Sequence, residues 1–168
     1  MLAIIQARSD SKRFPKKVLK KVYGNPLIYH VITRVLKSKK ISKVIVATSK
    51  NKSDDELVKY LKKIKIKFYR GSLDNVAERF VKAAETQKTN FFLRVNGDSP
   101  LIDPKLIDHV ISIFKKNMNN DIVTNVFPRT FPKGQSVEII KKSILKKNLK
   151  KMSISDQEHI TQFFYRNA

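Results

Sequence analysis

The sequence predicts an α/β fold in which helices cover a largely parallel β-sheet. Short apolar runs typical of strands alternate along the chain with stretches whose apolar residues recur at helical spacing. The 168 residues are 41% hydrophobic and contain no repeat, low-complexity tract or linker, so we expect one domain spanning residues 1–168. Regular alternation favours parallel strands, because each helix returns the chain to the end of the sheet where the previous strand began.

Six strands are predicted from runs rich in β-branched and aromatic residues. They cover residues 2–6, 43–48, 66–69, 91–95, 121–125 and 136–140. Helices are expected over 26–36, from Ser53 onward, over 74–84, from Asp103-Pro104 onward, over 142–150 and over 155–165. The first helix should have Asn25 as its N-cap and Pro26 at its first position. Acidic residues 54–56 should complement the positive end of the second helix.

Two loops carry the residues best suited to chemistry. In open parallel sheets the ligand lies beyond the carboxyl ends of the strands. The loop over residues 7–17, ARSDSKRFPKK, follows the first strand and offers Arg8, Arg13 and Lys17. Arginine gives forked donors to phosphate oxygens and lysine a point charge, so this loop suits a nucleoside triphosphate. It is neither a Walker A loop nor a GxGxxG motif, and an exposed basic loop is the plainer interpretation.

The second loop covers residues 96–102 and places Asp98 directly after Gly97. A carboxylate facing a polyphosphate is where a Mg²⁺ ligand is expected, since Mg²⁺ takes one or two protein carboxylates and shares the substrate's phosphates. Alternatively, Asp98 is a turn residue, because Gly-Asp-Ser-Pro forms turns in any case.

Composition excludes several classes of protein. The absence of cysteine rules out disulfides, thiolate metal sites and a cysteine nucleophile. No apolar run approaches the roughly 18 residues of a membrane helix, and the N-terminus lacks the basic flank of a signal peptide, so we expect a cytoplasmic protein without membrane contact. The three histidines form no HExxH pattern. His30 and His109 are expected to be packing or surface residues, and the role of His159 is open.

The net charge of +22 has two explanations. Lysine, isoleucine and asparagine are all frequent, which is typical of an AT-rich genome. A polyanion partner such as nucleic acid would also favour excess positive charge. The lysines occur as singles and pairs without interleaved aromatics, which favours a solvated surface but does not exclude nucleic acid.

Several segments resemble one enzyme family. Residues 4–19, IIQARSDSKRFPKKVL, resemble the signature of the sugar cytidylyltransferases, a strand followed by A-R-x-x-S-x-R-[LF]-P-x-K. Residues 94–104, RVNGDSPLIDP, are similar to the family's metal-binding Gly-Asp-x-Pro loop, and Arg70-Gly71-Ser72 with Glu78-Arg79 to its base-side segment. Residues 130–134 and 158–161 look like the branch of spore coat polysaccharide biosynthesis protein F, relatives of the acylneuraminate and 3-deoxy-manno-octulosonate cytidylyltransferases.

The resemblance implies a Rossmann-like nucleotidyltransferase fold, a three-layer α/β/α sandwich, and the reaction of CTP with a sugar acid to give a CMP-sugar and pyrophosphate for surface polysaccharides. It implies Mg²⁺ on Asp98, with Arg8, Lys17 and Asp98 as catalytic residues. The attacking group would be the sugar's own hydroxyl. The implied nucleotide-binding residues are Ala7, Arg8, Ser9, Ser11, Arg13, Lys17, Arg70, Gly71, Arg79 and Asn96.

Two departures from the family keep alternatives open. Places where relatives commonly have glycine are occupied by Asp10 and Lys16. The chain also stops soon after Glu-His-Ile-Thr, so we expect it to lack a C-terminal segment of longer relatives that can supply a second metal ligand. One alternative is therefore a nucleotide- or sugar-nucleotide-binding module without catalysis, and another is a basic nucleic-acid-binding protein. Relatives are often homodimers, so a homodimer is one expectation for the oligomeric state.

Overall fold

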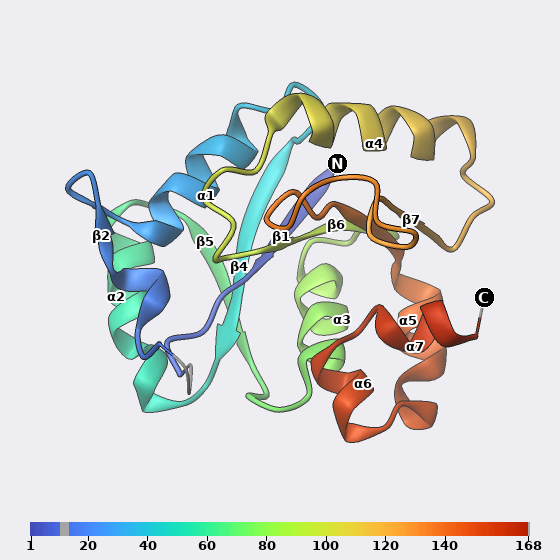
Figure 1. Cartoon of the computed structure of the whole chain (residues 1–168). Helices are drawn as coiled ribbons and strands as arrows, with labels where there is room; N and C mark the ends of the chain where they lie inside the picture. Colours follow the sequence, from blue (N-terminus) through green and yellow to red (C-terminus); the bar gives the residue numbers. More distant parts are fainter. Residues whose placement is uncertain (11–13, 168) are drawn as a thin grey trace.

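A six-stranded sheet forms the centre of the molecule, in a computed structural model that describes residues 1–10 and 14–167 (Figure 1). The strand order is β5-β4-β1-β6-β8-β7. The strands are β1 (Leu2–Gln6), β4 (Lys43–Ser49), β5 (Lys67–Gly71), β6 (Phe91–Asn96), β7 (Ile122–Thr124) and β8 (Glu138–Lys141). All six predicted strands are confirmed, with ends that move by at most a few residues.

The first four of these strands are parallel and bring their carboxyl ends to one edge. Strand β1 lies between β4 and β6, so that Ile4 pairs with Ile45 on one side and Arg94 on the other. Strand β8 runs antiparallel to both β6 and β7. The predicted mostly parallel sheet is therefore confirmed, and the loops after β1 and β6 are neighbours at its carboxyl edge.

Helices cover both faces of the sheet and make the three layers. They are α1 (Leu27–Leu36), α2 (Asp55–Lys63), α3 (Val76–Thr86), α4 (Pro104–Lys116), α5 (Lys142–Asn148), α6 (Ile154–Glu158) and α7 (Gln162–Arg166). One buried cluster joins α1, α2 and α4 to Ala3 and Ile5 of β1, and the other joins α3 and the C-terminal helices to Leu2 and Ile4. Alternate residues of one strand thus serve opposite faces. Figure 1 shows α1 and α4 on one side of the sheet and α3 with α6 on the other.

The start of the first helix differs from the prediction. Asn25 and Pro26 belong to a short strand β3 (Asn25–Pro26), which pairs with β2 (Lys21–Val22). Tyr23 and Gly24 connect them with φ values of 47° and 79°, as a tight two-residue hairpin turn requires. The expected Asn25 N-cap is therefore wrong: Pro26 takes the N-cap position in an extended conformation, with no side-chain cap.

The last predicted helix, 155–165, is interrupted. The structure has α6 and α7 instead, with His159, Ile160 and Thr161 between them. Ser153 and Asp156 form a capping box that starts α6, and Ile160 and Thr161 turn into the interior. Burial of these two residues overrides helical continuity and leaves His159 at a bend. No helix in the described part of the chain is long and apolar enough to span a membrane.

Candidate active site

A polar pocket of about 390 Å³ lies at the carboxyl ends of β1 and β6. It brings together residues from the two loops that the sequence singled out, from both strands and from the end of α6. Its lining is Gln6, Ala7, Arg8, Lys17, Val18, Arg94, Asn96, Asp98, Glu158 and His159. Of the predicted site residues, Ala7, Arg8, Lys17, Asn96 and Asp98 therefore meet in one place.

Gly97 explains how the two loops come so close. Its backbone N–H donates to the carbonyl of Gln6 at 2.8 Å, which ties the end of β6 to the end of β1. A Cβ added at Gly97 would lie 2.8 Å from that carbonyl oxygen and 2.9 Å from the Cβ of Ala7. Only glycine fits this approach without a shift of backbone, so Gly97 places Asp98 beside the first loop.

Two ion pairs cross the pocket. The Lys17 ammonium lies 2.6 Å from a carboxylate oxygen of Asp98, 81 residues further along the chain. Arg8 lies 2.6 Å from Glu158 of α6. The side chains of Lys17 and Asp98 are 34% and 44% exposed. Exposed pairs of this kind contribute little to stability, about 0–1 kcal/mol, so a charged ligand can separate them at small cost.

The first loop is held from beneath by Asp54. This fully buried carboxylate accepts hydrogen bonds from the Ser9 N–H at 2.6 Å and from the backbone and hydroxyl of Ser49. Burial by itself raises the pKa of Asp54, but the bonds from Ser49 and Ser9 outweigh it and leave that pKa below its usual value. Asp54 stands at the N-cap of α2, with Asp55 and Glu56 in the first turn as predicted, but its side chain makes no capping hydrogen bond there. It anchors Ser9 instead.

Lys16, near the end of this loop, ties the loop back to Ser9 and to helix α2. Its N–H donates to the Ser9 carbonyl at 2.8 Å, and its ammonium pairs with Glu56 of α2. Its φ of 55° lies in the left-handed region that favours glycine. The glycine expected here from relatives thus has a physical reason, and lysine takes the same conformation in this chain. The predicted contacts of Ser11 and Arg13 lie outside the described residues.

A second polar pocket of about 250 Å³ adjoins the first. It is built from the ends of β6 and β8, the segment after β7 and the bend before α7. Its lining is Arg94, Asn96, Val126, Arg129, Ser136, Glu138, His159, Thr161, Gln162 and Tyr165. Arg94, Asn96 and His159 line both pockets.

Buried charges form the floor of the second pocket. Glu138, 3% exposed at its side chain, pairs with Arg94 and accepts a hydrogen bond from the Tyr165 hydroxyl at 2.5 Å. Burial raises the pKa of Glu138, but the charge of Arg94 and the bond from Tyr165 outweigh burial and lower it. Burial and the nearby Glu138 carboxylate raise the pKa of Tyr165. Neither Arg94 nor Tyr165 was predicted from the sequence as a site residue.

Comparison with known proteins decides the family. The family model described as cytidylyltransferase matches residues 2–168. The chain belongs to the cytidylyltransferase family. It is an enzyme of the nucleotidyltransferase class, and the resemblance found in the sequence motifs is confirmed.

Relatives and solved structures agree with this family. The spore coat polysaccharide biosynthesis protein SpsF of Bacillus subtilis is 32% identical over 97% of this chain and 69% of its own. A 3-deoxy-manno-octulosonate cytidylyltransferase of Chlorobium phaeobacteroides is 32% identical over 76% of this chain and 51% of its own. A cytidylyltransferase structure from Leptospira borgpetersenii matches with a TM-score of 0.93 and 31% identity, over 99% of this chain and 71% of that one.

In this cytidylyltransferase, Arg70 lies away from the pocket of Lys17 and Asp98. Its guanidinium donates to the carbonyls of Ser49 and Asn51 at 2.9 Å each and lies 2.7 Å from Asp55. It therefore braces the loop between β4 and α2, beside a separate shallow surface of α2. The structure does not bring it together with the other predicted nucleotide-binding residues.

Gly71 and Arg79 pack against each other inside the molecule. A Cβ at Gly71 would lie 2.8 Å from Cγ of Arg79. Arg79 is fully buried, and one of its nitrogens donates to the carbonyls of Ser72 and Leu73. Burial, and then repulsion from Arg8, lower the pKa of Arg79 to about 10. Its contacts shape the loop after β5, and two of its nitrogens find no hydrogen-bond partner among the described residues.

The donors around Asp98 fit a shared Mg²⁺ ion. Cytidylyltransferases generally depend on a divalent metal. Among the described residues, no group of three or more His, Cys, Asp or Glu side chains could hold a metal ion without other ligands. Mg²⁺ commonly uses one or two carboxylates and completes its shell with water and substrate phosphates. The half-exposed carboxylate of Asp98, which pairs with Lys17, meets that requirement.

Proposed function

We propose that this cytidylyltransferase transfers CMP from CTP to a hydroxyl of a sugar acid of the nonulosonic or a related type, in the cytoplasm and for surface glycans, and releases pyrophosphate. The names of its relatives support both the nucleotide and the sugar class. The observation that carries the proposal is the meeting of Lys17 and Asp98, with Arg8, from loops far apart in sequence.

The first pocket would hold the triphosphate. Nucleotidyl transfer spreads negative charge over the α-phosphoryl group and the leaving pyrophosphate. Arg8 and Lys17 are fixed cations that stabilise this charge without rearranging during the step. On CTP binding, the phosphates would take the place of Asp98 beside Lys17, and of Glu158 beside Arg8. Asp98 would hold Mg²⁺, which when bound neutralises phosphate charge and orients the triphosphate.

The second pocket would hold the sugar acid. It adjoins the first and presents the guanidinium of Arg129, the Ser136 hydroxyl and the Gln162 amide. A guanidinium binds a carboxylate through two parallel hydrogen bonds, and hydroxyl and amide groups suit sugar hydroxyls. Buried Arg94 and Glu138 would keep the boundary between the pockets rigid.

A thermal-shift titration tests the nucleotide part. The protein is heated with Mg²⁺ and CTP, UTP, ATP or GTP in separate samples, beside Asp98→Asn. A ligand at about 100 times its dissociation constant stabilises the folded state by about 2.7 kcal/mol, so a clear shift with CTP alone is expected. Asp98→Asn should lose much of it, whereas Asp103→Asn, in the same loop region but a cap of α4, should keep it.

Release of pyrophosphate tests the transfer itself. We expect release that depends on CTP and on a sugar acid, tested with 3-deoxy-manno-octulosonate and N-acetylneuraminate. CTP binding with no pyrophosphate from any acceptor would replace this proposal by that of a binding module. No shift with any nucleotide, together with tight and salt-dependent binding of DNA or RNA, would replace it by that of a nucleic-acid-binding protein.

A further inference from the structure

The boundary between the two pockets is the place where the new bond would form, an inference that rests on the proposed function. With the triphosphate in one pocket and the sugar in the other, the α-phosphorus and the attacking hydroxyl must meet where the pockets join. Three residues line both pockets: Arg94, Asn96 and His159. These three side chains are therefore the candidates for handling the proton of that hydroxyl.

Two of the three are unsuited to accept a proton. Arg94 stays charged, and its guanidinium is already bound to Glu138 and to the side-chain oxygen of Gln6. The amide of Asn96 does not titrate. An imidazole changes charge near neutral pH and is the commonest general base of enzymes. Of the three described residues at the boundary, His159 alone offers that chemistry.

The bend between α6 and α7 presents His159 to the boundary. Its backbone N–H donates to the Ser155 carbonyl at 2.9 Å, and its carbonyl accepts from the Gln162 N–H at 2.8 Å. The next residue, Ile160, is fully buried and fixes the bend. The backbone is thus held at both sides, while the exposed ring makes no hydrogen bond to any described residue. The interruption of the predicted helix therefore places His159 at the boundary between the two pockets.

We propose that His159 is the general base of the transfer. Its ring nitrogen takes the proton of the sugar hydroxyl while the hydroxyl oxygen forms a bond to the α-phosphorus. The bond from the α-phosphorus to the oxygen that bridges to the β-phosphorus breaks, and pyrophosphate leaves with that electron pair. The imidazolium then gives its proton to water, which completes the balance.

Charged groups share the two pockets with the ring of His159. Four cations and three carboxylates line the two pockets that His159 also lines, and one phenol lines the second pocket. They are Arg8, Lys17, Arg94 and Arg129, then Asp98, Glu138 and Glu158, and finally Tyr165. Most of them are already paired with one another, so the charges that binding adds near the ring are those of the triphosphate and of the sugar's carboxylate.

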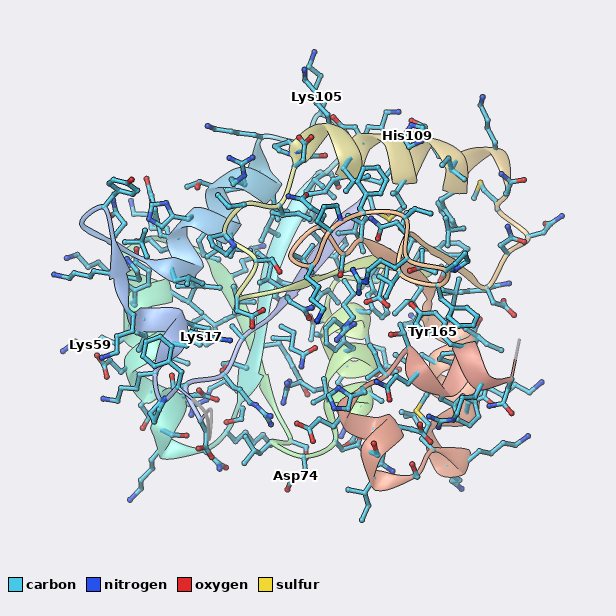
Figure 2. All side chains as sticks on the ribbon, viewed as in Figure 1. Lys17, Lys59, Asp74, Lys105, His109 and Tyr165 are labelled. Carbon is cyan, nitrogen blue, oxygen red and sulfur yellow. The ribbon has the colours of Figure 1, made fainter. Side chains whose placement is uncertain are left out.

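The test compares His159→Gln with His109→Gln. His109 is an exposed residue of α4 (Figure 2) and lines neither pocket. Pyrophosphate release is followed from pH 5 to 9 with 3-deoxy-manno-octulosonate, with N-acetylneuraminate and with water as the acceptor. We expect His159→Gln to lower kcat by about 10²–10⁴-fold. The wild type is expected to lose rate at acid pH, and His159→Gln should abolish that loss. His109→Gln should keep both rate and profile.

Two further readouts separate catalysis from structure. Imidazole in the buffer should restore part of the rate to His159→Gly but not to Lys17→Ala. In the wild-type NMR spectrum, CTP should shift the ring-proton signal of His159 and leave that of His109 in place. If CTP binds but neither this signal nor the rate of His159→Gln changes, the inference is overturned while the proposed function stands. If CTP does not bind the wild type at all, the proposed function itself has failed.

Discussion

Two cation–carboxylate pairs lie in neighbouring pockets and differ in their access to water. The side chains of Lys17 and Asp98 are 34% and 44% exposed, whereas those of Arg94 and Glu138 are 11% and 3% exposed. Separation of the exposed pair costs little, because water and ligands replace each partner. Separation of the buried pair leaves a charge without compensation. The first pair is therefore suited to exchange with substrate, and the second to hold the site in shape.

The largest expected effect comes from breaking the buried pair, which should lower the stability of the whole protein. Glu138→Gln should lower the free energy of unfolding by about 3–5 kcal/mol at pH 7, because Arg94 keeps a buried charge without its partner. Urea unfolding measures this loss. A loss below about 1 kcal/mol would show that the pair is not shielded from water as the structure indicates. The double variant Arg94→Leu with Glu138→Leu should recover much of the stability, since replacement of both charges removes the cost of burying either.

The exposed pair should show the opposite pattern, with a large effect on rate and a small one on stability. Lys17→Ala should lower kcat for pyrophosphate release by about 10²–10³-fold, the usual effect of removing one group that stabilises the transition state. Its free energy of unfolding should change by less than about 1 kcal/mol. The control is Lys105→Ala, whose side chain extends away from α4 in Figure 2 and should leave the rate unchanged. An unchanged rate in Lys17→Ala would remove Lys17 from the reaction.

Sequence periodicity was sufficient to predict the sheet and to predict that the loops after β1 and β6 meet. Strands that alternate with helices run parallel, so the residues after β1 and β6 had to lie at one edge. Gly97 gave a further signal, because a glycine between a strand and an acidic residue indicates close approach of backbone. The bend at His159 was not predicted, since the spacing favoured one helix over 155–165. Burial of Ile160 and Thr161 decides this bend, and the cluster that buries Ile160 includes residues of α3 and β8, which are distant in sequence.

The base-side segment shows where such reasoning was incomplete. Arg70 and Gly71 are adjacent in β5, and adjacent residues of a strand point to opposite faces. Arg70 therefore faces α2, whereas the side of Gly71 on which a Cβ would stand is filled by Arg79 of α3, so the two residues do not serve one pocket. Strand periodicity contained this information. In contrast, Arg94 and Glu138 could have been noticed as charges within the apolar runs FFLRV and VEII, where a buried pair is the usual reason for a charge.

An intermediate effect is expected at Asp54, which is buried like Glu138 but bonded to neutral groups. Asp54→Asn should lower the free energy of unfolding by about 1–3 kcal/mol, since an amide cannot accept all the hydrogen bonds from Ser9 and Ser49. It should also weaken CTP binding, because the first loop loses its anchor. Asp55→Asn is the matched control, with a carboxylate that is 59% exposed. If Asp54→Asn and Asp55→Asn lost the same unfolding free energy, burial of Asp54 would not be the reason for its effect.

The difference in unfolding free energy between the wild type and Asp54→Asn should depend on pH, in a direction that the pKa of Asp54 determines. The pKa of Asp54 is below its usual value in the folded state. Its contribution to stability is therefore present above the unfolded pKa, about 3.9, and is lost as the pH falls through the folded value. Unfolding in urea at pH 7 and again at pH 3 should show the gap between wild type and Asp54→Asn narrowing toward acid pH. A gap that widens toward acid pH would mean that the carboxylate is not held in its charged form.

The smallest effect should come from Glu56→Gln, which removes the surface pair between Lys16 and Glu56. Their side chains are 60% and 58% exposed, so the loss of unfolding free energy should be about 0–1 kcal/mol and should vanish in 1 M salt. This pair and the Asp54 anchor hold the same loop, one from outside and one from beneath. CTP affinity, measured by calorimetry, should therefore change less in Glu56→Gln than in Asp54→Asn. If the two variants weakened CTP binding equally, the charge that α2 places beside the loop would control the site, and burial of the anchor would not.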